Sequence, residues 1–262
     1  MPEEILLSVR DLVVRIKDEH NARPLLRGLS FDIRKNTIVS LVGGSGSGKT
    51  TTGLSILRLL PAAFSIEQGE IIFEGKDLLA LTELQMQSIR GRQIGMVFQE
   101  PLNAFNPVLT VGSQIEEVLF FHTSLRDSQI KEKVWQLLDI VGVPDPKRVA
   151  RSYPHQLSGG LRQRAMIAQA IAVSPKLIIA DEPTSNLDVT LQARIIELFR
   201  KLRSDLNISI LLITHDLGMV EHLADEVVIL SEGQVVESGR TQDVLKNPRH
   251  VFTRQLMDVL TT

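Results

Sequence analysis

The sequence predicts an α/β fold with a mainly parallel sheet, an antiparallel β edge subdomain and an inserted helical subdomain. Three observations support this prediction. Short apolar runs alternate with helical patterns, as they do in chains that form parallel sheets. Near each end of the chain, pairs of runs are typical of antiparallel strands. Between them, residues 101–172 contain helical patterns interrupted by prolines and no convincing strand.

The first part of the chain combines both kinds of strand. Residues 6–16 and 25–33 are predicted to form an antiparallel pair. Residues 38–42 form a mostly apolar run that ends in glycines, which indicates a buried strand of a parallel sheet. A helix is predicted over residues 48–60, and a further strand over residues 93–98.

The middle of the chain is predicted to be helical. Three helices are expected at residues 111–121, 128–141 and 161–173. We therefore assign residues 101–172 to a helical subdomain. Residues 1–100 and 173–262 are assigned to the α/β core with its antiparallel subdomain.

The last part of the chain returns to the α/β pattern. Residues 177–180 and 208–213 are rich in branched apolar residues, which favours buried strands. Residues 189–204 between them carry apolar side chains at helical spacing. Residues 227–237 are predicted to form a hairpin that turns at a Glu-Gly pair.

Composition excludes several classes of protein. The net charge of −2 provides no basic field for nucleic acid, which argues against a general DNA- or RNA-binding protein. The absence of cysteine excludes thiolate metal sites, disulfides and thiol catalysis. At 262 residues, the chain is long enough for one large core and a small inserted subdomain.

Hydropathy predicts no membrane span. No stretch reaches the roughly 18 uncharged apolar residues that a spanning helix requires. The most apolar region, residues 165–180, is interrupted by polar residues and by Pro175. The first four residues include two glutamates and lack the basic start of a secretory signal. Any role at a membrane is therefore expected to depend on partner proteins.

A phosphate-binding loop lies between the predicted strand 38–42 and the helix after it. The motif G-x-x-x-x-G-K-[ST] requires this context, and a plain Gly/Ser-rich turn is the alternative that the context disfavours. Backbone N–H groups of the loop surround phosphate oxygens, the lysine brings a positive charge and the hydroxyl suits Mg²⁺. The matching residues are Gly43, Gly44, Ser45, Gly46, Ser47, Gly48, Lys49 and Thr50, and we assign the adjoining Thr51 to the same site.

Two carboxylates follow the predicted strand 177–180. Asp181 is placed to hold Mg²⁺ at the end of a buried strand. Glu182, one residue beyond, is placed to polarise an attacking water as a general base. A lone Asp-Glu pair would favour an ordinary strand-end turn, but a complete phosphate loop in the same chain favours the catalytic interpretation.

Two further polar residues follow predicted strands. Gln99 comes after strand 93–98, and His215 comes after strand 208–213. Ligand sites of parallel sheets form at these strand ends, so both side chains are candidates to reach the terminal phosphate or its water. Each residue taken alone would favour an ordinary loop or capping role.

A second anion-binding feature lies in the helical region. Ser158, Gly159 and Gly160 open a predicted helix, whose first N–H groups and positive end attract anions. Arg162 and Arg164 stand in its first turns, where positive charge opposes the helix dipole. A bound polyphosphate would make them favourable, and pairing with nearby acids is the alternative.

Taken in order, these motifs resemble those of ABC-transporter ATPase subunits, over essentially the whole chain. Their order and number make chance agreement negligible. The six motifs are Gly43 to Thr50, Gln99, Leu157-Ser158-Gly159-Gly160, Asp181-Glu182-Pro183-Thr184, Ser185-Asn186-Leu187-Asp188 and His215.

The resemblance implies a P-loop NTPase core that hydrolyses ATP with Mg²⁺ as a head-to-tail dimer. One copy's phosphate loop and the other copy's Ser158 segment would enclose each ATP, with Asp188 at the interface. Thr50, Gln99 and Asp181 would hold Mg²⁺. The implied partners are a second ATPase subunit, transmembrane permease subunits and, indirectly, a solute-binding protein. The implied location is the cytoplasmic face of the cell membrane, as a peripheral subunit.

Finer features resemble the oligopeptide, dipeptide and nickel importers. They lie in residues 98–107, 153–158 and 247–253. Many members of that group carry a cysteine-bearing C-terminal extension, whereas this sequence has no cysteine and ends at Thr262, as shorter nickel and metallophore members do. The resemblance thus implies a peptide, nickel or a metal chelate as cargo.

The sequence departs from the family pattern at several positions. Family members usually stack an aromatic residue of the first strand pair on adenine, whereas Ile16 or His20 falls near that place here. Leu161 stands where Gln or Met is commoner, and Asn186 where Ala is commoner. None of these changes removes a catalytic group.

Two alternative functions stay open from the sequence. A soluble ABC-type ATPase that acts on DNA or ribosomes usually contains a long coiled coil or two fused ATPase units, and neither is found here. A regulatory module that binds ATP with little turnover is disfavoured by the presence of Glu182 and His215.

Overall fold

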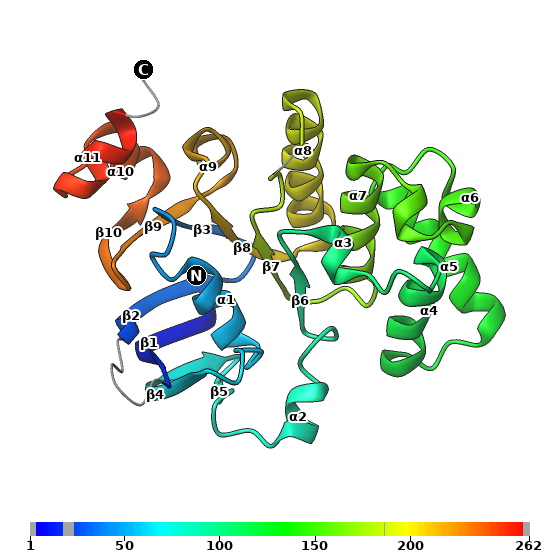
Figure 1. Ribbon diagram of the computed structural model, residues 1–262, viewed down its shortest axis with the longest axis horizontal. Coiled ribbons are helices and arrows are strands. Elements are labelled where there is room, and N and C mark those ends of the chain that lie inside the picture. Colours follow the sequence, from blue (N-terminus) through cyan, green and yellow to red (C-terminus); the bar gives the residue numbers. More distant parts are fainter. Residues whose placement is uncertain (1–3, 18–23, 186, 259–262) are drawn as a thin grey trace. The chain divides into compact units, whose positions relative to one another are not determined.

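The computed structural model describes residues 4–17, 24–185 and 187–258 (Figure 1). The chain divides into two compact units. The first comprises Met1–Met86 and Ser209–Thr262, and the second comprises Gln87–Ile208. The functional division predicted at residues 100 and 172 is a different assignment and stays a prediction.

An antiparallel sheet forms one part of the first unit. Its strands are β1 (Ile5–Ile16), β2 (Pro24–Arg34), β4 (Phe64–Phe73) and β5 (Lys76–Asp77), in the order β2-β1-β4-β5. The pairing of β1 with β2 confirms the strand pair predicted near the N-terminus. The other two strands were not predicted.

Parallel strands form the other part of the first unit. Strand β3 (Ile38–Gly43) pairs in parallel with β8 (Ser209–Thr214) on one side and with β9 (Glu226–Ser231) on the other. Strand β10 (Gln234–Arg240) pairs antiparallel with β9, as the predicted hairpin requires. Helix α1 (Lys49–Ile56) follows β3 after a short loop.

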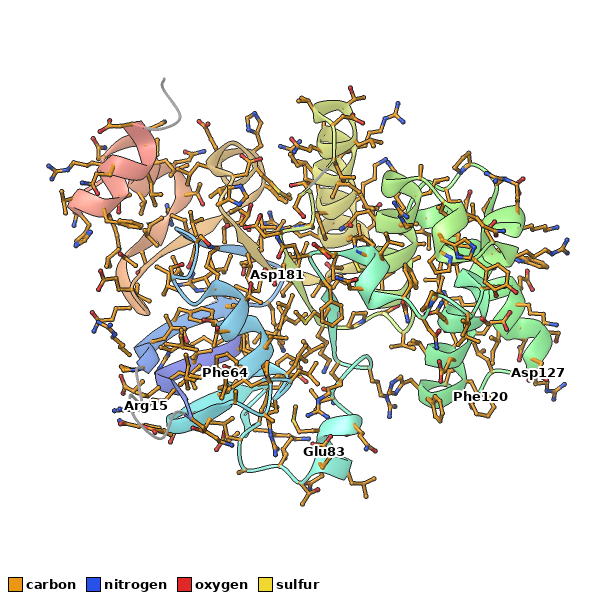
Figure 2. The ribbon with its side chains drawn as sticks, viewed as in Figure 1. Arg15, Phe64, Glu83, Phe120, Asp127 and Asp181 are labelled. Atoms are coloured by element: carbon orange, nitrogen blue, oxygen red, sulfur yellow. The ribbon has the colours of Figure 1, made fainter. Side chains whose placement is uncertain are left out.

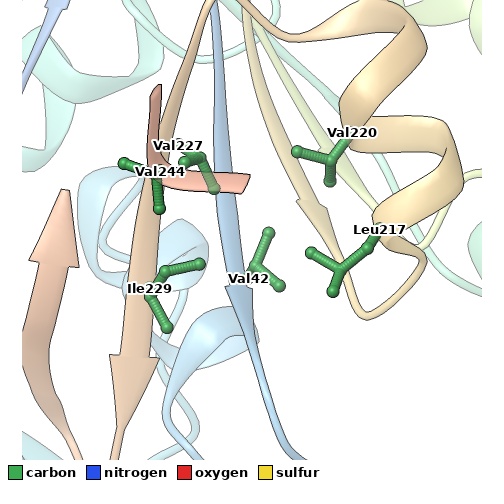
Figure 3. Packing of buried hydrophobic residues seen from close by; sticks show 6 residues of the cluster. All are labelled: Val42, Leu217, Val220, Val227, Ile229 and Val244. Carbon is green, nitrogen blue, oxygen red and sulfur yellow. The ribbon is translucent and has the colours of Figure 1, made fainter. Parts of the chain in front are cut away.

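Three further helices complete the first unit: α9 (Leu217–Leu223), α10 (Thr241–Lys246) and α11 (Val251–Asp258). They pack on the parallel strands through a buried apolar cluster, which Figure 3 shows in close-up. Its members are Val42, Leu217, Val220, Val227, Ile229 and Val244. The partly buried side chains of α11 pack against the same cluster, so the C-terminal helix is tied to the strands that lead into the functional loops.

The second unit contains one parallel strand pair and most of the helices. Strand β6 (Ile94–Val97) pairs in parallel with β7 (Leu177–Asp181). No strand occurs between them in residues 98–176, all of which are described, so the helical character predicted for this region is confirmed. The main helices of this unit are α3 (Pro101–Ala104), α4 (Val111–His122), α5 (Asp127–Ile140), α6 (Pro146–Arg151), α7 (Gly159–Ala170) and α8 (Val189–Leu206). A short helix, α2 (Glu83–Gln87), crosses the boundary between the two units and lies mostly in the first.

Side-chain caps explain where several of these helices begin. Thr110, Asp145, Ser158 and Asp188 each accept a hydrogen bond from a backbone N–H of the first turn that follows them. Such caps satisfy N–H groups that have no partner within the helix. Within the described ranges, none of the helices combines the length and apolar character needed to cross a lipid bilayer.

Candidate functional site

The loop between β3 and α1 has the backbone of a phosphate cradle. Gly48, which precedes α1, has a φ of 104°, a conformation that side chains with a Cβ rarely adopt. A Cβ at this position would lie 2.5 Å from Leu26 Cδ2, so packing as well as conformation requires glycine here. The glycine therefore lets the loop turn directly into the N-terminus of α1, where backbone N–H groups attract anions.

The lysine of the loop is held inside it. Lys49 is only 8% exposed, and its Nζ donates to the carbonyl oxygens of Gly43 at 2.9 Å and Gly44 at 3.0 Å. These bonds position a positive charge at the mouth of the loop. Thr50, the next residue, is exposed at the start of α1.

A cavity of about 520 Å³ adjoins the loop. Ser45, Gly46 and Ser47 form part of its wall. The Ser47 side chain is 5% exposed, and its Oγ has no hydrogen-bond partner among the described residues. A buried donor without an acceptor costs free energy, and phosphate oxygens would supply the acceptor.

His215 lies at the same edge of the sheet as the phosphate loop. Strands β3 and β8 run in parallel with Val42 beside Thr214, so Gly43 and His215 both follow the carboxyl ends of neighbouring strands. His215 is exposed. Asp216, the next residue, caps α9 by accepting from the Met219 N–H at 3.0 Å, which fixes the loop that carries the histidine.

The two predicted carboxylates lie at the end of β7 in the second unit, where Figure 2 labels Asp181. Both side chains are buried: Asp181 is 3% exposed and Glu182 is 8% exposed. Glu182 has a φ of 45°, which is unusual for a residue with a side chain. Such strained backbone is concentrated at functional sites, where the surrounding structure enforces it.

Gln99 shares an edge of the second unit with these carboxylates. The parallel register places Val97 of β6 beside Ala180 of β7, so both strands end together. The Ser185 hydroxyl donates to the backbone oxygen of Gln99 at 3.3 Å and connects the two following loops. The side chain of Gln99 is exposed.

Ser158, Gly159 and Gly160 open helix α7 as predicted. The Ser158 Oγ accepts from the Leu161 N–H at 3.4 Å, a long and weak cap. Gly160 is buried, and a Cβ there would lie 3.0 Å from Leu191 Cδ1 of helix α8. The second glycine therefore has a packing role as well as a backbone role.

One of the two arginines near this helix start has a structural partner. Arg164 donates to the carbonyl oxygen of Val141, the residue that ends α5. Burial, with a further contribution from the charge of Arg194, lowers the pKa of Arg164. The partner found for Arg164 is thus a backbone oxygen at a helix C-terminus, where positive charge is favourable, and not the acidic side chain that was the alternative to a bound polyphosphate.

A second cavity, of about 210 Å³, lies beside Gln99 in the same unit. Its wall includes Pro101, Leu102, Gly159, Arg162 and Gln163. Gln163 is 3% exposed, and its Nε2 has no hydrogen-bond partner within the described ranges. The Ser158 helix start and the loop after Gln99 therefore meet at one polar-lined hollow.

Asp188 is placed at the start of α8, where its carboxylate accepts from the Leu191 N–H at 2.9 Å. The side chain is exposed. Its neighbour Asn186 lies outside the described residues, as does His20, one of the two candidates for the adenine contact. The other candidate, Ile16, lines the cavity beside the phosphate loop.

Several residues of that cavity were not assigned to the site from the sequence, among them Arg27 of β2 and Phe252 of α11. The Nε of Arg27 is buried and has no hydrogen-bond partner in the part of the chain that the structure describes. Arg27 belongs to none of the motifs, and Phe252 lies in residues 247–253, which were noted for their resemblance to importers and not as part of the nucleotide site.

This geometry, a strand, a glycine-rich cradle and a helix carrying a buried lysine, defines a P-loop nucleotide-binding protein. The model of the ABC transporter family matches residues 26–185, and the chain belongs to that family.

Known proteins of this family resemble the chain along most of its length. It is 44% identical over 258 residues to the oligopeptide transport ATP-binding protein OppD of Bacillus subtilis, covering 98% of this chain and 72% of that protein. It is 42% identical over 255 residues to the dipeptide transport ATP-binding protein DppD of the same species, covering 97% of this chain and 76% of that protein.

A solved structure matches the fold as well. It is a dimeric ATP-binding cassette in a post-hydrolysis state with ADP and Pi. It superposes with a TM-score of 0.81 at 26% sequence identity, covering 90% of this chain and 98% of that chain.

Proposed function

We propose that this chain is the ATP-hydrolysing subunit of an ABC importer and that its cargo is a peptide. The observation that carries the proposal is the phosphate cradle, with Lys49 held at its mouth and a buried Ser47 hydroxyl that has no partner in the described chain. The relatives named for oligopeptide and dipeptide transport support the cargo class. Nickel or a metal chelate is the less favoured cargo.

The phosphate loop binds the triphosphate of ATP. Backbone N–H groups of Gly44, Ser45, Gly46, Ser47 and Gly48 surround the phosphates, together with those of Lys49, Thr50 and Thr51 at the start of α1. The Lys49 ammonium offsets phosphate charge, as a lysine does at this position of a P-loop.

We assign Mg²⁺ to the oxygen donors of Thr50, Gln99 and Asp181 from their chemistry alone, since Mg²⁺ prefers hydroxyl, amide and carboxylate oxygens. When bound, it would neutralise charge on the phosphates. Asp181 offers its oxygens at the end of β7, and Thr50 offers its hydroxyl at the start of α1.

Glu182 is the general base of hydrolysis. Its carboxylate accepts a proton from water as the water oxygen bonds to the terminal phosphorus and the bond from that phosphorus to the bridging oxygen breaks, so that ADP leaves. Burial at 8% exposure and the enforced backbone at φ 45° restrict where this carboxylate can point. Gln99 and His215 orient the water and the terminal phosphate, and both act as hydrogen-bonding groups from strand ends.

The Ser158 segment acts on a nucleotide bound to a second subunit. Ser158, Gly159 and the start of α7 present hydroxyl and N–H groups that suit phosphate oxygens. A head-to-tail dimer would bring this segment to the phosphate loop of the other copy, with Asp188 close to the interface. The partner is either a second copy or a related ATPase chain.

Permease subunits of the membrane are the second class of partner. The cavity next to Gln99 is lined by apolar Pro101 and Leu102 and by Gln163, whose buried amide lacks a partner among the described residues. A short helix of a permease would fill it and sense movement of the Gln99 loop. The chain then acts as a peripheral subunit on the cytoplasmic face of the membrane, and a solute-binding protein delivers the cargo.

This function gives the two parts of the chain different tasks. Residues 1–100 and 173–262 form the nucleotide-binding core with its antiparallel subdomain. Residues 101–172 form the helical subdomain, which carries the Ser158 segment and meets the permease.

The substitution Glu182→Gln tests the hydrolytic function. It keeps the size and burial of the side chain and removes its basicity, so we expect ATP binding to persist and turnover to fall by about 10²- to 10⁴-fold. Glu221→Gln, at an exposed carboxylate of α9, is the matched control and is expected to hydrolyse ATP normally. Rapid steady-state hydrolysis by the Glu182 variant would refute the base assignment.

The cargo needs a separate experiment. The intact membrane complex is purified with its solute-binding component, and mass spectrometry identifies the ligand that this component carries. Peptides are the expected result. Recovery of a metal or metal chelate would replace the peptide assignment, and association with ribosomes or DNA would contradict the transport function.

A further inference from the structure

One wall of the cavity beside the phosphate loop is formed by the C-terminal helix α11. Phe252 of helix α11 lines it together with Gly44, Ser45 and Gly46. The Phe252 Cζ lies 4.0 Å from the position that a Cβ of Gly44 would occupy, so the tip of the ring reaches the loop itself. Among the residues that the structure places around this cavity, Phe252 is the only aromatic one.

The segment that carries Phe252 is fixed before it reaches the cavity. The Glu237 carboxylate of β10 accepts the backbone N–H groups of Arg249 at 2.9 Å and His250 at 3.0 Å. The Phe252 N–H then donates to His250 Nδ1 at 3.2 Å. Later in the helix, Leu256 packs against the apolar cluster of this unit. The ring is therefore held in place before any ligand binds, which reduces the entropic cost of binding.

The turn between β9 and β10 connects the phosphate loop to strand β2. The Gly233 N–H donates to the Ser47 carbonyl at 3.1 Å, and the Gly233 carbonyl accepts from the Arg27 N–H at 2.8 Å. The cavity thus joins apolar side chains, among them Ile16 and Phe252, to the backbone of the phosphate loop. An aromatic ligand that carries acceptor oxygens matches both features.

We propose that Phe252 packs against the base of the nucleotide bound at the phosphate loop and takes the place of the stacking aromatic for which this sequence has Ile16 or His20. The proposal rests on the proposed ATP-binding function of this loop. It makes the C-terminal helix part of the nucleotide site. Stacking of a base on an aromatic side chain is favourable for any base, since each has a π-face. Phe252 therefore contributes affinity more than discrimination between purines.

Binding measurements on the full chain separate the base from the phosphates. Calorimetry with Mg²⁺ compares ATP with inorganic tripolyphosphate, which has no base. We expect Phe252→Ala to weaken ATP binding about tenfold, equal to about 1.4 kcal/mol, and to change tripolyphosphate binding less than twofold. Phe252→Tyr keeps the ring and is expected to bind ATP like the unchanged chain.

Two further variants control for folding. Gln255→Ala, at an exposed position of the same helix and outside the cavity, is expected to leave both affinities unchanged. Phe252→Leu preserves apolar packing if the alanine variant fails to fold, and it is expected to show the same selective loss of ATP affinity.

The outcomes distinguish this proposal from the proposed function. If the unchanged chain binds neither ligand, the phosphate site itself is wrong. If it binds both ligands but the Phe252 variants lower their affinities equally, or not at all, the nucleotide site stands and the role of Phe252 is refuted. Loss of ATP affinity in His20→Ala alone would assign the base contact to the first strand pair and overturn the proposal.

Fluorescence provides an independent readout. The sequence contains one tryptophan, Trp135, in the second unit. Phe252→Trp combined with Trp135→Phe therefore places a single fluorophore at the cavity. We expect ATP to quench its emission and tripolyphosphate to leave it unchanged, and equal responses to both ligands would contradict base contact.

Discussion

Ser158→Ala separates the capping role of Ser158 from its proposed role at the nucleotide of another subunit. In the structure the hydroxyl accepts from the Leu161 N–H at 3.4 Å, near the limit of a hydrogen bond. Loss of an N-cap serine costs about 0.5–2 kcal/mol, and so long a cap corresponds to the lower end, about 0.5 kcal/mol. We therefore expect nearly unchanged stability in urea denaturation.

The effect on hydrolysis is expected to be much larger. Removal of one hydrogen-bond donor that stabilises transition-state charge lowers kcat by about 10²- to 10³-fold. The substitution leaves the chain's own phosphate loop intact, so ATP affinity measured by calorimetry is expected to change little. A loss of stability large enough to explain the loss of turnover would refute this reasoning.

Mixing two inactive variants tests which subunit Ser158 serves. In a head-to-tail dimer of Lys49→Ala with Ser158→Ala, one site carries both defects and the other carries none. Random pairing of equal amounts is then expected to restore about one quarter of the normal activity, since half of the dimers are mixed and each has one intact site. If each chain used its own Ser158, mixing would restore nothing. Mixed dimers are confirmed with two affinity tags. An inactive mixture that contains mixed dimers would contradict the head-to-tail arrangement.

Two further predictions concern the unit that contains the phosphate loop. Gly48→Ala forces a residue with a Cβ to φ 104° and places it 2.5 Å from Leu26 Cδ2, so we expect a loss of about 2–4 kcal/mol in urea denaturation. Gly46→Ala, at φ 75° with open space around it, is the matched control and is expected to lower the free energy of unfolding by about 1–2 kcal/mol. Equal losses in the two variants would exclude the contact with Leu26 as a cause. The second prediction concerns the pH dependence of stability through the Glu237 carboxyl. Burial raises the pKa of this group, but the Thr253 hydroxyl, the N–H groups of Arg249 and His250 and the charge of His250 lower it. The net effect is a pKa below the ordinary value of 4.5. Because the pKa is lowered on folding, the carboxylate stabilises the fold above about pH 4.5, and this contribution is lost as pH falls through the lowered value. Glu237→Gln is expected to flatten the acid side of the stability profile, and an unchanged profile would contradict the anchoring role.

The sequence predicted the parts of the fold whose pattern is local. The strand at residues 38–42, the helices of the middle region and the hairpin after residue 226 show a clear period or turn signal, and each matches an observed element. The phosphate loop was also predictable, since its residue types and its place between strand and helix are both written in the sequence.

Other elements had no local signal. Strand β4 (Phe64–Phe73) contains polar residues and Gly69, whose φ of 107° accompanies an irregular register against β1. Glycine and charge disfavour strand assignment from sequence. Helix α11 is only eight residues long, and it is held by tertiary packing and by the Glu237 carboxylate. Short helices have weak intrinsic stability, so such contacts determine whether they form.

In the candidate site, too, only residues that belong to a local motif could be assigned from the sequence. Asp181, Glu182 and Ser158 were assigned from motifs, and the structure adds their burial, their backbone strain and their capping bonds. Phe252 and Arg27 lie far from the loop in sequence, and no pattern assigned them to the nucleotide site. The turn after β9 holds Arg27, whereas the Glu237 carboxylate and the apolar cluster hold the segment that carries Phe252.

The capping bonds also explain why motif residues alone give an incomplete account of the site. Asp188, in a motif, and Asp216, next to the motif residue His215, both use their carboxylates to cap helices, so both have a folding role that does not depend on nucleotide. A substitution at either residue would lower stability by about 0.5–2 kcal/mol before any effect on catalysis. Lost activity in such variants is evidence for an interface role only when it is larger than the lower folded fraction explains. Ser158 has a long and weak cap, so among the motif residues it is the one where the effects on folding and on turnover separate most clearly.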